Sequence, residues 1–316
     1  MKQKLFLTIL LSSLLFSSCD TITGKKDDNN TASLIAAAAL VNQTKTSTAA
    51  SVKTINFNVV SGTSNVTCAG TIPGTVAGVT GTTLNDLRFY VHDVKLISAD
   101  GTKVDFTITT DNKWQLAAGS NQYGAYSGVA LLDFEDKTNG CATTGTTDMN
   151  KSITGTSPVG NYIGVEFKVG VPFYLNHMNV ATATSPLNIT EMYWAWASGY
   201  KFVKIEYTAS SKNSFHLGSH TCTGNTSGPV NQCSQPNIPT ITLTKATGFD
   251  STKDVVTLDI NALYTGADAS STGINTCMAG NATSSPKTAC EPMIKNIGLN
   301  FTTGATATTQ TAFSLK

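Results

Sequence analysis

The sequence has few charged side chains and almost no charge imbalance. Only 13% of its 316 residues are Asp, Glu, Lys or Arg, and the formal net charge is +1. A nucleic-acid-binding surface needs a concentrated basic face, so the composition argues against that class of partner. Thr, Ser, Asn and Gly are abundant instead, which is typical of a β-rich extracellular surface with many turns.

The sequence also lacks the motifs that mark common enzyme sites. It has no Gly-x-Ser-x-Gly elbow, no phosphate-binding glycine loop and no His-Glu-x-x-His helix. The acidic residues Asp133, Glu135 and Asp136 lack the spacing of a calcium loop. We interpret them as structural, with hydrogen bonds or ion pairs to Lys201 or Arg88. We therefore expect a protein that is not an enzyme.

Long apolar runs are missing after the first twenty residues. Two early lysines precede an apolar run over 5–16, and Ser17 and Ser18 follow, directly before Cys19. This order predicts a signal peptide over 1–18, and the run is shorter than the about 20 residues of a membrane helix. Small residues before a single cysteine favour a bacterial lipoprotein, with Cys19 lipidated; the alternative is an ordinary signal peptide with an incidental cysteine.

We expect a bacterial cell-envelope protein that is held at the membrane through lipid on Cys19. Residues 19–52 read as a flexible tether, because they are rich in Asn, Thr, Ser and Ala and poor in aromatic and branched residues. Residues 53–316 then form one domain, a length that large one-domain β folds commonly reach.

The six remaining cysteines predict disulfides, since an even number in an exported protein favours pairing. Six cysteines allow 15 pairings. Cys222 and Cys233 flank one loop rich in Gly, Asn and Ser, and Cys277 and Cys290 bracket a similar loop, so each is expected to pair. Cys68–Cys141 follows by elimination. Thiolate metal binding is the competing interpretation, but no Cys-x-x-Cys pair is present.

Alternating apolar residues predict strands, for example at 54–60, where Ile55, Phe57 and Val59 alternate with polar residues. Asp100-Gly101 is typical of a hairpin turn. Many short strands with Gly, Asn and Pro between them predict an all-β sandwich or barrel-like domain with long loops and little helix. The other predicted strands are 87–97, 104–108, 129–134, 162–169, 192–196, 201–207, 215–217, 240–244 and 255–260, and the predicted helices are 261–264 and 292–299.

A series of short motifs runs through these strands. They are Leu87-Arg88-Phe89-Tyr90-Val91, Trp114-Gln115, Val129-Ala130-Leu131-Leu132-Asp133-Phe134-Glu135-Asp136, Gly170-Val171-Pro172-Phe173, Leu175-Asn176-His177, Pro186-Leu187-Asn188, Trp194-Ala195-Trp196, Gly199-Tyr200-Lys201-Phe202 and His216-Leu217-Gly218-Ser219. Each motif is weak alone, but their order over 54–301 is specific. The series resembles the MbnP family, the partners of the MauG-like dihaem protein MbnH.

The resemblance implies a copper-binding β protein of the periplasm or cell surface. In this family the first Trp of a Trp-x-Trp motif is oxidised to kynurenine by a dihaem cytochrome c peroxidase-like partner, and copper is then held as Cu(I). The corresponding residue here is Trp194, with Trp196 as the second tryptophan. The chain departs from the family pattern at His92 and His220.

Only four histidines are available as copper ligands. Imidazole and soft donors suit Cu(I). His177 follows an apolar segment, and His216 lies at a strand end beside the expected Cys222–Cys233 disulfide, so these two are our predicted ligands together with Trp194. Weaker candidates for the metal are His220, His92, Met192 and Met178.

Two other functions remain possible from the sequence. Met192, Trp194 and Trp196 alternate along a predicted strand, and an apolar core face would produce the same pattern. A surface-exposed binding or adhesion lipoprotein with no metal is therefore the alternative function. A metal-dependent enzyme is a third hypothesis, opposed by the lack of catalytic motifs.

Overall fold

The computed structural model describes residues 49–316 apart from 138–139, 142–145, 196, 225–229, 269–276 and 279–286. The predicted signal peptide, Cys19, most of the predicted tether and Trp196 lie outside these described residues. Within them, no helix is both long and apolar enough to cross a bilayer.

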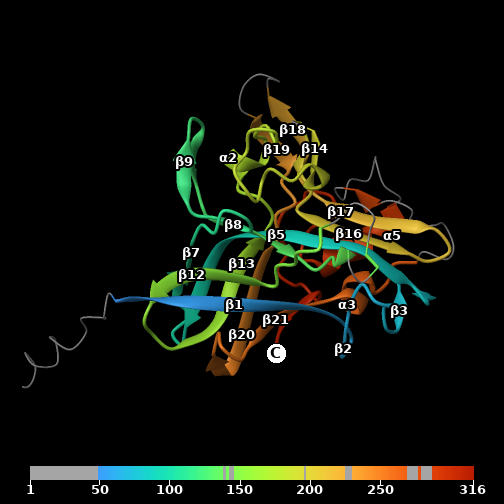
Figure 1. Ribbon diagram of the computed structural model, residues 1–316, viewed down its shortest axis with the longest axis horizontal. Helices are drawn as coiled ribbons and strands as arrows, with labels where there is room; N and C mark the ends of the chain where they lie inside the picture. The colour runs from blue at the N-terminus through green and yellow to red at the C-terminus, as the bar shows by residue number, and fades with distance from the viewer. Residues whose placement is uncertain are drawn as a thin grey trace, which may run out of the picture. The chain divides into compact units, whose positions relative to one another are not determined.

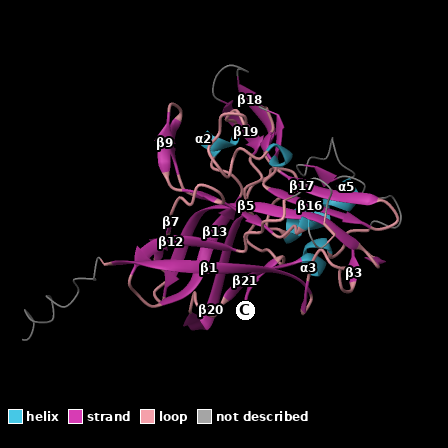
Figure 2. Cartoon of the chain, viewed as in Figure 1, coloured by secondary structure: helices cyan, strands magenta, loops and turns pink. Residues whose placement is uncertain are grey.

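The predicted all-β class is confirmed, and helices are few and short (Figure 2). Two of them correspond to the predicted helices, although the second begins at Lys287 and contains Pro292 inside it. Helices among the described residues include α2 (Phe173–Asn176), α3 (Ile260–Tyr264), α5 (Lys287–Asn296) and the 3-10 turn η2 (Thr190–Met192).

The first of two main sheets is built on β1 (Ala50–Ser61), which begins before the domain start expected at residue 53. Its apolar side chains Ile55, Phe57 and Val59 are buried on one face, as their alternation predicts. The strand order is β23-β21-β1-β12-β7, with β2 also paired to β1. The bounds are β2 (Ser64–Asn65), β7 (Thr107–Ile108), β12 (Ser152–Pro158), β21 (Val255–Asp259) and β23 (Phe313–Leu315).

The second, larger sheet is centred on the long strand β5 (Thr83–Ser98), with the order β20-β13-β5-β16-β17-β22. Strands β6 and β11 also pair with β5, and β8 pairs with β11. The bounds are β6 (Lys103–Asp105), β8 (Gln115–Leu116), β11 (Val129–Asp133), β13 (Tyr162–Val169), β16 (Val203–Thr208), β17 (Lys212–Leu217), β20 (Thr240–Phe249) and β22 (Cys277–Met278).

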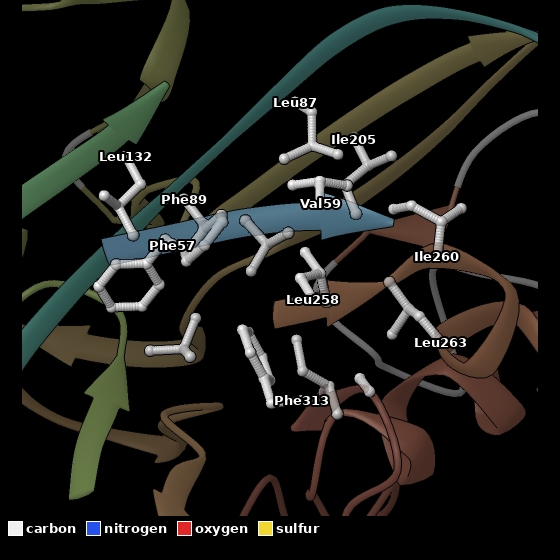
Figure 3. Packing of buried hydrophobic residues seen from close by; sticks show 14 of the residues in the cluster. Phe57, Val59, Leu87, Phe89, Leu132, Ile205, Leu258, Ile260, Leu263 and Phe313 are labelled. Atoms are coloured by element: carbon white, nitrogen blue, oxygen red, sulfur yellow. The ribbon is translucent and has the colours of Figure 1, made fainter. Parts of the chain in front are cut away.

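Side chains from both main sheets meet in one hydrophobic core, so the domain is a sandwich (Figure 3). Four phenylalanines form a ring of edge contacts: Phe57 lies 6.2 Å from Phe89 and 5.7 Å from Phe167, and Phe313 lies 5.9 Å and 5.6 Å from the same two rings. Aromatic pairs at these distances stabilise a core beyond their buried area. The two sheets are therefore held together by contacts between β1, β5, β13 and β23.

Truncating one ring of this core should destabilise the domain strongly. We expect Phe57→Ala to lower the free energy of unfolding by about 3–5 kcal/mol, because it removes a buried ring and leaves a cavity. The measurement is urea denaturation followed by circular dichroism. The matched control is Val52→Ala on the same strand, whose side chain is 71% exposed; equal effects of the two variants would contradict this account of the core.

The other face of the larger sheet is covered by the segment 170–200 and by hairpins. A second hydrophobic cluster lies there, with Tyr90, Leu131, Met192 and Tyr200 among its buried members. In Figure 1, α2, β9, β14, β18 and β19 lie on the opposite side of β5 from β1. The small strands are β3 (Thr75–Val76), β4 (Val79–Thr80), β9 (Gly119–Asn121), β10 (Gly124–Tyr126), β14 (Tyr193–Ala195), β15 (Gly199–Tyr200), β18 (His220–Gly224) and β19 (Val230–Gln235).

Two predicted strands differ from the structure. The stretch 104–108 is divided between the sheets, because β6 pairs with β5 whereas β7 pairs with β12. For the predicted strand 192–196, the observed strand β14 (Tyr193–Ala195) starts one residue later, because Met192 ends the turn η2; residue 196 lies outside the described residues. Met192 is therefore not part of a strand face shared with Trp194.

Candidate metal centre

A row of buried polar side chains crosses four strands of the larger sheet. Asp133 of β11 is paired in register with Arg88 of β5, Arg88 with Lys204 of β16, and Lys204 with His216 of β17. None of the four is more than 7% exposed. They occupy the face opposite the sandwich core, because their strand neighbours Leu87, Phe89, Val203 and Ile205 point into that core.

Asp86 forms ion pairs with the two cations of this row, Arg88 and Lys204. Its carboxylate accepts hydrogen bonds from Arg88 Nε at 2.9 Å and Arg88 Nη2 at 2.5 Å, and from Lys204 Nζ at 2.6 Å. Asp86 itself is fully buried. A buried charge without a partner is costly, so these contacts make the buried row possible.

Glu206 is the hydrogen-bond partner of His216, the histidine of this row. Its Oε1 lies 3.0 Å from His216 Nε2, and its Oε2 lies 2.6 Å from Lys212 Nζ. Burial alone would raise the pKa of Glu206, but the hydrogen bonds from His216 and Lys212, aided by the charge of Lys204, lower that pKa well below its usual range. Glu206 is therefore a carboxylate that can accept a hydrogen bond from the imidazole N–H.

The other nitrogen of His216 has no hydrogen-bond partner among the described residues. Nδ1 is buried, while Nε2 faces Glu206. Burial lowers the pKa of His216, with the hydrogen bond to Glu206 acting in the opposite direction. A neutral imidazole that donates from Nε2 keeps its lone pair on Nδ1, which is the form that binds metals.

Trp194 lies beside this imidazole. The ring centroids of Trp194 and His216 are 6.3 Å apart, and the ring planes are tilted by 56°. The indole also packs against Gly218, where a Cβ atom would fall 2.5 Å from Trp194 Cζ3. Glycine at this position is thus what lets the partly buried indole approach the end of β17.

His177 lies directly after α2, near the Cys222–Cys233 disulfide. Its Nε2 is 3.1 Å from Asn176 Nδ2 and 3.6 Å from Cys233 Sγ. The Asn176 amide also lies 3.3 Å from Ser219 Oγ and accepts a hydrogen bond from the Tyr200 backbone N–H at 2.9 Å. Asn176 therefore ties the His177 segment to Tyr200 and to Ser219, which lies three residues after His216 in the chain.

Sequence comparison places the chain in a known family. The sequence model of the MbnP family matches residues 25–279. The chain belongs to the MbnP family. No curated protein sequence matches it significantly. Among solved structures it is similar to MbnP from Methylosinus trichosporium, with a TM-score of 0.70, 27% identity, and coverage of 84% of this chain and 98% of that one.

The cysteine pairing of this MbnP-family domain is the one expected from spacing. The disulfides are Cys68–Cys141, Cys222–Cys233 and Cys277–Cys290. The second of them joins β18 to β19, where the two cysteines are directly opposite each other in the antiparallel ladder. This disulfide stiffens the hairpin against which His177 lies.

Two of the weaker metal candidates lie in other surroundings. His92 is four residues beyond Arg88 on β5, about 13 Å along the strand, and its Nδ1 pairs with Ser127 Oγ at 3.1 Å. Burial lowers the pKa of His92 to about 3. His220 begins β18, with Nδ1 2.7 Å from Thr221 Oγ1. His92 therefore does not share the surroundings of Trp194 and His216.

The two methionine candidates have other partners in the structure. Met192 is fully buried in the second hydrophobic cluster, and the Met178 sulfur lies 3.8 Å from Asn121 Nδ2.

Of the expected partners of the acidic stretch, Arg88 interacts electrostatically with Asp133 and Glu135. Arg88 pairs with Asp86, and Lys201 Nζ donates to the Glu191 carbonyl. Asp133 faces Arg88 in register, but burial raises the pKa of Asp133 to about 8 despite that nearby positive charge.

Sequence reasoning missed Glu206, Asp86 and Asn176. The signal for the first two was present: charged residues alternate with apolar ones in Asp86–Tyr90 and in 203–207. Such alternation is usually the sign of a solvent-facing strand face. The pattern does not reveal that this face is covered; in the structure, side chains such as Leu175, Leu187 and Met192 pack on it.

Proposed function

We propose that this chain is a copper-binding protein of the MbnP type, in which Cu(I) is held by His216, His177 and a kynurenine formed from Trp194. The observation that carries the proposal is the buried Nδ1 of His216, which has no hydrogen-bond partner among the described residues, on an imidazole whose ring centroid lies 6.3 Å from that of Trp194.

The residues around the His216 imidazole fit a copper ion. Imidazole nitrogen suits copper, and Cu(I) accepts few ligands. A metal-bound histidine usually donates its second N–H to a carboxylate, which fixes the ring and raises its basicity. Glu206 is placed for that role on His216. Copper, when bound, supplies a redox-active or transferable cation; the protein supplies a fixed imidazole in a site sheltered from water.

His177 is proposed as the second imidazole ligand. It is partly buried, and Asn176 links its segment to Ser219, three residues after His216. Trp194 cannot bind a metal through its intact indole. Oxidative opening of the pyrrole ring gives an aromatic amine and a ketone, either of which is a donor, so the modification would complete the ligand set.

The oxidant for that step is proposed to be a dihaem partner of the MauG type. Phe173 and Tyr174 on α2 are 37% and 39% exposed, and the Phe173 ring lies 6.0 Å from the His177 ring. Exposed aromatic side chains are enriched at protein interfaces. They support a docking surface for the partner close to the site.

The setting is proposed to be the bacterial cell envelope, with lipid on Cys19 as the anchor. Three disulfides support an oxidising compartment. We propose no catalytic activity for the chain itself. The alternative, an adhesion module without metal, predicts that the double variant His177→Ala/His216→Ala leaves the metal content of the purified protein unchanged.

Intact mass tests the modification. Protein co-expressed with the dihaem partner should be heavier by about 4 Da than protein made alone, the change from tryptophan to kynurenine. Tandem mass spectrometry should place the change at residue 194. Trp194→Phe is the control, because it should abolish the shift. A mass unchanged by the partner, together with the absence of copper, would rule out the proposed function.

A further inference from the structure

His177 lies next to two sulfur atoms as well as near the proposed copper site. One ligand atom each from His177, Cys222 and Cys233 lies within 4.8 Å of the other two. The two cysteines are joined as a disulfide across β18 and β19. Among the described residues this is the one group of three His, Cys, Asp or Glu side chains close enough to hold a metal ion.

In the disulfide form these sulfur atoms are poor ligands, since it is the thiolate that binds metals. Reduction would leave two thiols beside an imidazole. Zinc–sulfur bonds are about 2.3 Å and zinc–nitrogen bonds about 2.0–2.1 Å, so neighbouring ligand atoms in a tetrahedral site lie about 3.6 Å apart. His177 Nε2 and Cys233 Sγ are already 3.6 Å apart.

This disulfide is also more accessible than the other two. Cys222 and Cys233 are partly exposed, whereas each of the other paired cysteines is at most 6% exposed. It closes a separate two-stranded ribbon and is not part of the main sheets. A reductant in solution should therefore reach it first, without disturbing the sandwich core.

We propose that reduction of Cys222–Cys233 creates a second metal site, made of the two thiolates and His177, for a thiophilic cation. The reductant is a dithiol: two electrons and two protons pass to the cysteine sulfurs while the dithiol becomes a disulfide. Binding of the cation then releases the two thiol protons to water. The cation replaces the Asn176 amide as the partner of Nε2.

Because His177 is also a proposed copper ligand, this site would compete with the copper centre when the envelope becomes reducing. The second site does not itself require kynurenine or the dihaem partner. Its existence is therefore tested independently of the proposed function.

Cadmium titration of the mature chain tests the site. After reduction with a phosphine that carries no thiol, wild-type protein should bind Cd(II) stoichiometrically and show a thiolate-to-cadmium absorption band in the ultraviolet. The oxidised protein should show no band. Alkylation followed by intact mass should count two free thiols, which shows that only the accessible disulfide was opened.

Three variants separate the outcomes. Cys222→Ser/Cys233→Ser should abolish the band, His177→Ala should weaken binding about tenfold or more, and His216→Ala should leave it unchanged. Absence of the band in the reduced wild-type protein, or equal cadmium affinity in His177→Ala, would overturn the proposal. A failure of Cu(I) binding by oxidised protein would instead count against the copper centre alone.

Discussion

Replacing His216 with alanine is expected to weaken Cu(I) binding by the kynurenine-containing protein about 100-fold or more, roughly 3 kcal/mol of binding free energy. The substitution removes the buried Nδ1, together with the ring that lies beside Trp194, and leaves Glu206 without its imidazole donor. The measurement is competition for Cu(I) with a coloured chelator of known affinity, under argon and with the disulfides intact.

Matched variants show which property of the imidazole matters. Glu206→Gln keeps the shape of the side chain but removes the charge that accepts from His216 Nε2; the loss of such a partner usually costs about 10–100-fold in metal affinity. His92→Ala is the control for loss of a buried histidine outside the site, and copper affinity should not change. Full copper affinity in His216→Ala would refute the ligand assignment.

The second large effect is expected from Asp86→Asn. This near-isosteric change removes the carboxylate charge shared by Arg88 and Lys204, and both cations remain buried. Breaking a buried ion pair by removal of one partner destabilises a protein by about 3–5 kcal/mol. Urea denaturation of the metal-free protein should show this loss as a lower midpoint with little change in slope.

The control is an ion pair of the same chemistry at the surface. Lys113 Nζ lies 2.5 Å from Asp148 Oδ2, and both side chains are more than half exposed. Asp148→Asn should therefore change the free energy of unfolding by less than about 1 kcal/mol. If Asp86→Asn lowered the free energy of unfolding no more than Asp148→Asn, the ion pairs of Asp86 with Arg88 and Lys204 would not stabilise the fold as described.

Local sequence patterns predicted those strands that are long and alternate regularly. The prediction at 54–60 lies inside β1, and 87–97 lies inside β5. Short strands such as β3 and β4 were missed, because two residues carry no periodicity. The stretch 104–108 was predicted as one strand, yet it serves two sheets, a division that only the packing of those sheets imposes.

The candidate site was only partly predictable. Trp194, His177 and His216 were named from the family resemblance, and the structure places two of these rings next to each other. Glu206 could not be assigned to His216 from the sequence. Its hydrogen bond depends on the pairing of β16 with β17 and on a cover formed by a distant loop. The first contact lies within a hairpin of consecutive strands, but the second joins segments that are far apart in the chain.

The buried charged side chains of β5 and β16 also favour one strand register in the larger sheet. A slip of β5 or β16 by one residue would turn Asp86, Arg88, Lys204 and Glu206 into the hydrocarbon interior of the sandwich, because side chains alternate between the two faces. Burying these charges there without partners would make the misaligned sheet far less stable than the native one. The same charged side chains that surround the His216 imidazole thus disfavour strand registers in which the proposed copper ligands would not come together.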